Sequence, residues 1–399
     1  MRRIIESLQV EQLNNSKVLH NNVQHNSVNA KATIALSWQY KAISSGKLRR
    51  YFSLKNVTDT ARIMAGFFQS FAQLKSFKPD VVFCKGGYVT VPVAAAAYIL
   101  NIPVWIHESD VSLGLATRIN SKFAKRIFVS FEETKKYFTG SRAAKVQVVG
   151  NPIRASVTHG NAQRAREFLL NAQMIKGGET DKKGLFFHGF SEKIPVILVM
   201  GGSLGSQFVN EALDKSLDVL LKEYAVIHIT GNEGEQLIRH ERYRSFHFIN
   251  EELPDCYALA DVIVSRSGAG SVFECAAVKK PTVFIPLSSR ASRGDQIENA
   301  KAAARFMNAH VIEEEQLLKN PSILPQAIHK IMSEQIEQNP EKNNREKNMR
   351  IGQLGQKNGA SSMGVSREHE HSVTNSNSIL NINAAEVIAS QLSYFPSNL

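Results

Sequence analysis

The stretch that decides the fold spans residues 195–206 and reads Pro-Val-Ile-Leu-Val-Met-Gly-Gly-Ser-Leu-Gly-Ser. Its apolar first half, rich in β-branched residues, predicts a buried strand over residues 195–200. Its glycines permit a tight turn, and the apolar spacing that follows predicts a helix over residues 207–222. A buried strand joined to a helix by a short turn is the repeating unit of a parallel α/β sheet.

The same alternation continues on both sides of this stretch. Downstream, strands are predicted over residues 225–229, 247–249, 262–265 and 282–285, with helices that include residues 271–278 and 295–305. Upstream, strands are predicted over residues 80–84, 104–107, 126–129 and 146–149, and helices over residues 57–77, 91–100 and 113–123. Strands that alternate with helices predict two parallel sheets, each with helices on both faces.

Length and composition divide the chain into segments. A chain of 399 residues, 43% of them apolar, accommodates two domains with a core in each. The dipeptide Asn151-Pro152 is a candidate hinge, because proline interrupts a strand ladder and favours a turn. The expected segments are a polar lead with the composition of a disordered chain (1–40), a first domain (41–150), a second domain (151–334), a flexible polar insertion (335–378) and a final helix (379–399).

The net charge of +12 favours an anionic partner: a nucleic acid, an acidic membrane surface or a phosphorylated substrate. Zinc-finger spacings and RNA-binding aromatic signatures are absent from the sequence, which disfavours a nucleic acid. The three cysteines, Cys84, Cys256 and Cys275, lie far apart and without metal-ligand spacing. We therefore expect reduced, buried thiols and no bound metal.

Any membrane contact is expected to be peripheral. The most apolar stretch, residues 89–106, is interrupted by two prolines and an asparagine and is better read as a helix and a buried strand than as a membrane span. Residues 47–52, Lys-Leu-Arg-Arg-Tyr-Phe, place basic side chains beside aromatic ones, which suits an anionic bilayer surface. The alternative is a solvated basic lead-in to a core helix.

Two turns of small residues follow strands that are expected to lie in one sheet. Residues 200–206 offer the Ser203 hydroxyl and backbone N–H groups to a phosphate, and residues 266–274 place Glu274 one turn into a helix, where its carboxylate suits two ribose hydroxyls. Each turn alone has a structural alternative. Residues 200–206 could be a glycine-rich connection without a ligand, and Glu274 could be a favourable charge near a helix N-terminus. Together they indicate a ligand site, because open α/β sheets bind ligands beyond the carboxyl ends of their strands.

Other polar groups follow other strands. Asp295, Gln296 and Asn299 suit sugar hydroxyls, or they cap the helix in which they lie. His107 and Glu108 suit acid–base chemistry, or they form a buried pair that holds a loop. The residues alone leave both alternatives open.

Seven segments, in order, resemble those of the MurG family, the bacterial transferase that adds N-acetylglucosamine to the lipid-linked muramyl-peptide precursor of peptidoglycan. These segments are residues 44–51, 85–89, 107–110, 150–154, 199–206, 266–269 and 293–296. They look like the variety that uses Lys-containing stem peptides. The resemblance implies a GT-B fold of two Rossmann-like, doubly wound α/β domains facing a cleft. It also implies an inverting, metal-independent transfer, in which UDP-N-acetylglucosamine is a substrate and no cofactor takes part.

The resemblance implies roles for individual residues of the second domain. The donor UDP-N-acetylglucosamine is expected there, with Ser203 at the diphosphate, Arg154 at the donor, the backbone of Ile249 at the uracil and Gln296 at the sugar. The residues expected to cover the phosphate and the ribose are Ala269, Gly270, Ser271, Val272, Phe273 and Glu274, with Glu274 on the ribose.

The first domain is expected to hold the acceptor, an undecaprenyl-linked muramyl-peptide, at the cytoplasmic side of the cell membrane. Asp110 stands where many family members have an asparagine on the acceptor side, next to His107 and Glu108. The anionic membrane surface is the third expected partner, and nucleic acid is not expected.

One departure from the family concerns residues 1–40. Family members open with a strand and a Gly-rich loop that ends in Gly-His and supplies the catalytic base, whereas residues 22–26 contain no glycine and follow no recognisable strand. We therefore expect residues 1–40 to match the family poorly, the first βα unit to be missing, and the catalytic residue to be unknown. The alternative to an active transferase is a truncated, non-catalytic relative that binds a UDP-sugar or acts as a membrane scaffold.

Overall fold

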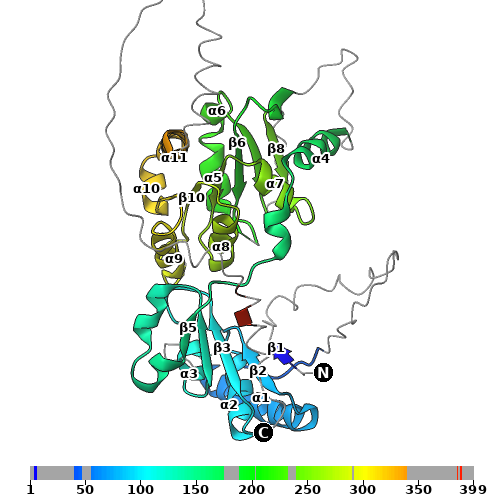
Figure 1. The fold of residues 1–399 in the computed structure, drawn as a ribbon, viewed down its shortest axis with the longest axis vertical. Helices are drawn as coiled ribbons and strands as arrows, with labels where there is room; N and C mark the ends of the chain where they lie inside the picture. The colour runs from blue at the N-terminus through cyan, green and yellow to red at the C-terminus, as the bar shows by residue number, and fades with distance from the viewer. Residues whose placement is uncertain are drawn as a thin grey trace, which may run out of the picture. The chain divides into compact units, whose positions relative to one another are not determined.

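The computed structural model describes residues 4–6, 40–46, 55–174, 188–202, 204–231, 240–289 and 292–338, together with residues 384, 387 and 388. The chain divides into two compact units, Met1–Val148 and Val149–Leu399. Each unit contains a parallel sheet with helices packed against it (Figure 1). The predicted two-part α/β architecture is confirmed.

Unit 1 is built on a sheet of five described strands in the order β1-β2-β3-β4-β5, with every neighbouring pair parallel. The strands are β1 (Ile4–Glu6), β2 (Val81–Cys84), β3 (Val104–Glu108), β4 (Arg126–Val129) and β5 (Val146–Val148). The helices are α1 (Lys55–Phe77), α2 (Thr90–Ile99) and α3 (Leu115–Asn120). Strands β2 and β3 are buried along their whole length, as expected for central strands of a parallel sheet.

Strand β1 corrects the prediction for residues 1–40. The sequence predicts a disordered lead without a strand, whereas Ile4 lies opposite Val81 and Glu6 opposite Phe83 in a parallel ladder with β2. Only three residues take part, and a run this short carries no periodicity that separates it from a polar segment.

Unit 2 is built on a parallel sheet of six strands in the order β11-β10-β9-β6-β7-β8. The strands are β6 (Val196–Met200), β7 (Ala225–Ile229), β8 (Tyr243–Phe246), β9 (Val262–Ser265), β10 (Thr282–Phe284) and β11 (Ala309–Val311). Along the chain the strands are added outward from β6 to β8, and then from β9, on the other side of β6, to β11. The strand order therefore reverses between β6 and β9, and a doubly wound sheet binds its ligand at such a reversal.

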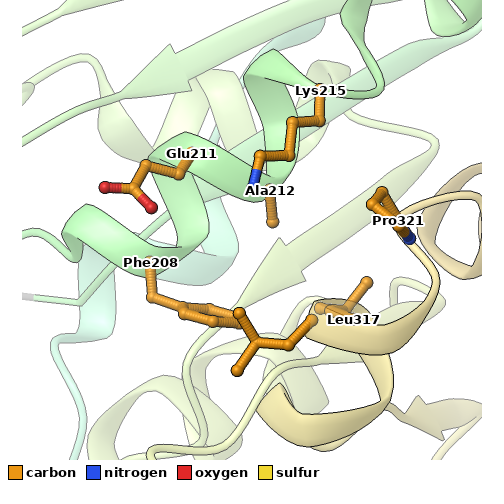
Figure 2. A pocket seen from close by; sticks show the side chains of 7 residues that line it. Phe208, Glu211, Ala212, Lys215, Leu317 and Pro321 are labelled. Carbon is orange, nitrogen blue, oxygen red and sulfur yellow. The ribbon is translucent and has the colours of Figure 1, made fainter.

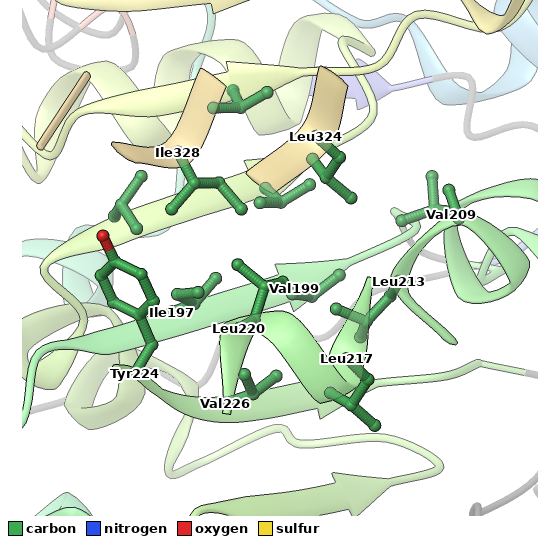
Figure 3. Close-up of a cluster of buried hydrophobic side chains, with 14 of the residues drawn as sticks. Ile197, Val199, Val209, Leu213, Leu217, Leu220, Tyr224, Val226, Leu324 and Ile328 are labelled. Carbon is green, nitrogen blue, oxygen red and sulfur yellow. The ribbon is translucent and has the colours of Figure 1, made fainter. Parts of the chain in front are cut away.

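The helices of unit 2 cover this sheet. They are α4 (Ala162–Met174), α5 (Gln207–Asp214), α6 (Leu217–Leu220), α7 (Leu253–Leu259), α8 (Ala269–Ala277), α9 (Asp295–Ala303), α10 (Glu314–Lys319) and α11 (Ile323–Gln338). Figure 3 shows side chains of α5, α6 and α11 meeting the alternate residues Ile197 and Val199 of β6 in one apolar core. This core fixes the strand ends at which the candidate site lies.

Two element predictions in unit 2 need correction. The helix predicted over residues 207–222 is two helices, α5 and α6, and the Ser216 hydroxyl between them donates to the Ala212 carbonyl at 3.0 Å, a bond that competes with regular helix geometry. The strand predicted over residues 247–249 lies earlier, at Tyr243–Phe246. This strand is at the edge of the sheet and only partly buried, so its polar residues hide it from an apolar pattern.

Helix α11 continues to Gln338, beyond the predicted start of the polar insertion at residue 335. The rest of that insertion, and most of the predicted final helix, lie outside the described residues. Within the described part of the chain, each helix is too short or too polar to cross a bilayer.

Candidate functional site

The turn after β6 has a backbone that only glycine permits. A Cβ on Gly201 would lie 2.3 Å from the Ser206 nitrogen, and Gly205, at φ +81°, packs against Gly231 beyond β7. Ser206 ends the turn as the N-cap of α5, where its hydroxyl accepts from the Val209 N–H at 3.3 Å. The predicted diphosphate residue Ser203 lies outside the described residues.

The turn after β9 opens onto space in front of a helix. Helix α8 starts after Gly268 without a side-chain cap, and a Cβ placed on Gly268 or Gly270 would meet no atom within 4 Å. The first N–H groups of a helix lack partners within the helix and carry partial positive charge. This helix start therefore offers donors to an anion, and the side chains of Ala269, Val272 and Phe273 are buried beneath it.

Glu274 lies one turn into α8 and has two neighbours of opposite character. Its Oε2 accepts a hydrogen bond from the Tyr257 hydroxyl at 3.1 Å. Its Oε1 lies 3.8 Å from Nη2 of Arg154, whose side chain is 54% exposed. Two predicted donor residues, Arg154 and Glu274, are thus brought together, while Tyr257 was not predicted.

Arg266 ties several turns of the site together. It is the first residue after β9, is 6% exposed, and donates from Nε to the Ser206 hydroxyl at 2.9 Å. Its Nη1 donates to the Ile285 carbonyl at 3.1 Å and lies 2.7 Å from Oε1 of Glu314. The other Glu314 oxygen accepts from the Ser288 N–H at 3.1 Å. One buried ion pair therefore links the turn after β6, the turn after β9 and the segment after β10.

Gln296 contacts both the turn after β9 and the segment after β10. Its carbonyl accepts from the Ser267 hydroxyl at 2.8 Å, and its side-chain Oε1 accepts from the Leu287 N–H at 3.0 Å. Asn299 is fully buried, and its side-chain amide donates to the Ser267 carbonyl at 3.2 Å. It therefore supports the turn after β9 and does not cap α9, the helix in which it lies.

Ile249 lies in the segment after β8 rather than in a strand, and its side chain is buried. Two residues earlier, the His247 carbonyl accepts a hydrogen bond from the Gly231 N–H at 3.1 Å. The end of β8 is therefore joined to Gly231, which in turn packs against Gly205 in the turn after β6. Gly231 therefore contacts both the segment predicted to bind uracil and the turn predicted to bind the diphosphate.

A buried histidine of β7 contacts side chains of β8 and α5. His228 of β7 is fully buried, with Nδ1 2.8 Å from the Tyr243 hydroxyl and Nε2 3.0 Å from Oδ1 of Asn210. The Asn210 amide donates to the Thr230 carbonyl at 3.1 Å, which orients its oxygen toward Nε2 of His228. Burial lowers the pKa of His228 to about 4, so the ring is neutral at pH 7.

The polar residues of unit 1 lie at the end of β3. Glu108 is 7% exposed, and its two oxygens accept from the N–H groups of Asp110 at 3.3 Å and Gly114 at 3.2 Å. Burial raises the pKa of the Glu108 carboxyl, and the Asp110 charge adds to this effect. His107 is also buried, at 1% exposed. The geometry agrees with the loop-holding alternative for Glu108.

A small hollow elsewhere in unit 2 does not compete with this site. Figure 2 shows it between α5 and α10, and its lining residues are Phe208, Glu211, Ala212, Lys215, Leu317, Leu318 and Pro321. Its volume of about 20 Å³ is roughly that of one or two water positions. A nucleotide sugar does not fit there, and none of the predicted donor residues lines it. Among the described residues, no cluster of three or more metal-binding side chains is present.

Family models match both units. A model for the glycosyltransferase family 28 C-terminal domain matches residues 196–354, and one for the glycosyltransferase family 28 N-terminal domain matches residues 12–129. The second match starts inside residues 1–40, so the expectation that this segment matches the family poorly needs correction for residues 12–40.

Several curated relatives are described as the same kind of transferase. A UDP-N-acetylglucosamine–N-acetylmuramyl-(pentapeptide) pyrophosphoryl-undecaprenol N-acetylglucosamine transferase 2 of Bacillus cereus is 44% identical over 278 residues, 69% of this chain and 73% of the relative. The corresponding transferase of Clostridium perfringens is 42% identical over 305 residues, 76% of this chain and 77% of the relative. Among solved structures, Acinetobacter baumannii MurG matches with a TM-score of 0.50 and 27% identity, covering 69% of this chain and 71% of that one.

Proposed function

This chain belongs to the MurG family of glycosyltransferases with the GT-B fold, and from this premise we propose that it makes the lipid II precursor of peptidoglycan. In the proposed reaction, N-acetylglucosamine passes from UDP-N-acetylglucosamine to an undecaprenyl-diphosphate-linked N-acetylmuramyl-peptide. An acceptor hydroxyl oxygen bonds to the anomeric carbon of the sugar as the bond from that carbon to the UDP phosphate oxygen breaks. The hydroxyl proton passes to a base on the acceptor side.

The observation that carries the proposal is the pair of turns at the reversal of strand order between β6 and β9. The turn after β6 and the uncapped start of α8, which follows β9, both lie at the carboxyl ends of strands that flank this reversal. Anionic ligands bind at this position in doubly wound sheets. Within the proposal, Ser203 and the start of α8 bind the diphosphate, and Glu274 binds the ribose. Arg154 neutralises negative charge beside Glu274, Ile249 binds the uracil through its backbone, and Gln296 binds the sugar.

Calorimetric titration of the full chain with UDP-N-acetylglucosamine tests the donor assignment. We expect a dissociation constant between about 1 μM and 1 mM, the range of ordinary enzyme substrates, and displacement by UDP. A titration with a guanosine diphosphate sugar is the matched control, because the uracil contact then has no partner. No heat at millimolar UDP-N-acetylglucosamine would refute the donor site.

Peripheral attachment to an anionic membrane is the second part of the proposal. Unit 1 exposes large apolar side chains on α1, with Met64 50% and Phe68 63% exposed, and at the end of α2, with Tyr98 57% exposed. The basic segment 47–52 ends three positions before the start of α1 in the sequence, and it lies outside the described residues. Apolar side chains with basic neighbours bind anionic bilayers by insertion and charge attraction together.

Sedimentation with lipid vesicles tests this attachment. We expect the chain to bind vesicles that contain anionic lipid, less so at high salt, and Phe68→Ser to weaken binding. Val219→Ser, a change at an apolar residue of unit 2 that is 52% exposed, is the control. Equal binding of both variants would remove α1 from the proposed membrane surface.

A second function is favoured by one sequence observation: the first glycine of the chain is Gly46, so residues 1–45 contain no glycine-rich loop. In this second candidate the chain binds a UDP-sugar without transferring it. Both candidates predict donor binding, and only the first predicts a glycosylated lipid product. Turnover by this chain excludes the second candidate.

A further inference from the structure

Tyr257 is a buried tyrosine whose hydroxyl meets a residue of the proposed donor site. It lies on α7, its side chain is fully buried, and no predicted role includes it. Its hydroxyl is 3.1 Å from Oε2 of Glu274 and 3.4 Å from Sδ of Met200, the last residue of β6. The hydroxyl therefore lies between the two turns that flank the reversal of strand order.

The hydroxyl has one proton, and the two neighbours are unequal acceptors. A carboxylate accepts a stronger hydrogen bond than a thioether, so the proton goes to Glu274. Burial raises the pKa of Tyr257 well above its ordinary value, which keeps the hydroxyl a donor at every working pH. A buried tyrosine with a fixed ring has few ways to move its oxygen, so Oε2 of Glu274 is held at one place.

The Tyr257 hydrogen bond uses only part of the acceptor capacity of Glu274. A carboxylate accepts about four hydrogen bonds, and Tyr257 uses one. The Glu274 side chain is 18% exposed, so part of it reaches solvent, and Nη2 of Arg154, at 3.8 Å from Oε1, is beyond hydrogen-bond distance. The geometry leaves Oε1 and one lone pair of Oε2 for two neighbouring hydroxyls of a ligand.

We propose that Tyr257 is a positioning residue for ribose recognition: its hydroxyl fixes the Glu274 carboxylate so that it accepts the 2′- and 3′-hydroxyls of the nucleotide. The proposal rests on the proposed function, since it takes the UDP ribose as the ligand of Glu274. It adds a specificity consequence. Tyr257 supports the preference of the site for a ribonucleotide over its 2′-deoxy analogue.

The test compares UDP with 2′-deoxy-UDP by calorimetric titration of the full chain and of Tyr257→Phe, which removes the hydroxyl and keeps the ring. We expect the variant to bind UDP about tenfold more weakly, the lower end of the effect of one hydrogen bond to a charged group. We expect a smaller loss for 2′-deoxy-UDP, which offers Glu274 only its 3′-hydroxyl, so that the ratio of the two affinities falls. Tyr224→Phe is the matched control. Its hydroxyl contacts His329, and it lies at the amino end of β7, opposite the site, so both affinities stay unchanged.

A double variant tests whether Tyr257 acts on UDP binding through Glu274. In a Glu274→Ala background, Tyr257→Phe is expected to change UDP affinity by less than about twofold, because the partner of the hydroxyl is already gone. Met200→Leu removes the sulfur acceptor and keeps both Tyr257 and Glu274, so it is the control for packing around the hydroxyl and is expected to keep the wild-type ratio of UDP to 2′-deoxy-UDP affinity.

The outcomes separate the inference from the proposed function. An unchanged ratio of UDP to 2′-deoxy-UDP affinity in Tyr257→Phe, or an undiminished effect of Tyr257→Phe in the Glu274→Ala background, would overturn the role of Tyr257 while wild type still binds UDP. A wild-type chain that binds neither nucleotide would overturn the proposed function, and the inference with it.

Discussion

At the scale of the residue, Glu274 is the most informative side chain of the site. Its carboxylate is positioned by Tyr257 and faced by Arg154, in a helix that starts at the reversal of strand order. Glu274→Ala is expected to weaken UDP binding by about tenfold to a hundredfold, since hydrogen bonds to a charged group contribute about 1.5–3 kcal/mol. Titration with UDP measures this loss. Glu298→Ala, which removes the same charge from α9, is the control. Equal losses of UDP affinity in the two variants would show that Glu274 does not bind the ribose.

The buried Arg266–Glu314 pair is expected to matter for folding as well as for the site. The two side chains are 8% and 11% exposed, and Glu314→Ala leaves the Arg266 charge buried without its partner. Such a loss costs about 3–5 kcal/mol of the free energy of unfolding. Urea denaturation measures it, with Glu211→Ala on the exposed side of α5 as the control, expected within about 0.5 kcal/mol of wild type. A loss no larger than that of the control would show that the pair is solvated.

At the scale of the element, the network of His228, Asn210 and Tyr243 joins α5, β7 and β8. The pKa of His228 falls from 6.5 in the unfolded chain to about 4 in the folded one. Between these values the unfolded chain binds a proton that the folded chain does not. The free energy of unfolding therefore falls as the pH falls from about 6.5 to 4, by about 1.4 kcal/mol per pH unit, and the stability is fully present above pH 6.5.

Urea denaturation at pH 7 and pH 5 measures this dependence. The difference in pH slope between wild type and His228→Gln isolates the histidine from the other titrating groups. The exposed His159→Gln is the control and is expected to keep the wild-type slope. A wild-type slope in His228→Gln would mean that another group titrates.

Elements were predictable from sequence where burial is complete. Strands β6, β7 and β9 are buried along their whole length, so their apolar runs mark them plainly. The apolar pattern misplaces β8 and does not indicate β11, because each strand lies at an edge of the sheet and is partly exposed, so apolar and polar residues mix. The break between α5 and α6 rests on a local hydrogen bond of Ser216 that apolar spacing does not report.

The candidate site was predictable only in the residues that follow strands. Arg154 and Glu274 were named from turns and from a family resemblance, and the structure brings them within 3.8 Å. Tyr257 was missed because it lies 17 residues before its partner, on another helix, and a buried tyrosine in sequence looks like any other core residue. Side chains that position a functional residue carry no motif, since their role depends on the packing of separate elements.

At the scale of the whole molecule, the two units differ in the strand order of their sheets. Unit 2 carries the reversal of strand order and the turns expected of a nucleotide-sugar site. In the described part of unit 1 the strands follow chain order without such a reversal, and the family's Gly-rich loop has no counterpart in residues 1–45. In the proposed function, unit 2 binds the donor and unit 1 supplies the acceptor side of the transfer.

The formation of a glycosylated lipid product tests the central claim most directly. The full chain is incubated with labelled UDP-N-acetylglucosamine and an undecaprenyl-diphosphate-linked muramyl-peptide in vesicles that contain anionic lipid, with Glu274→Ala as a matched variant. We predict that label enters the lipid fraction with release of UDP, and that Glu274→Ala lowers the rate at subsaturating donor by about tenfold or more. Donor binding without labelled lipid would contradict the transferase and leave the non-catalytic binder.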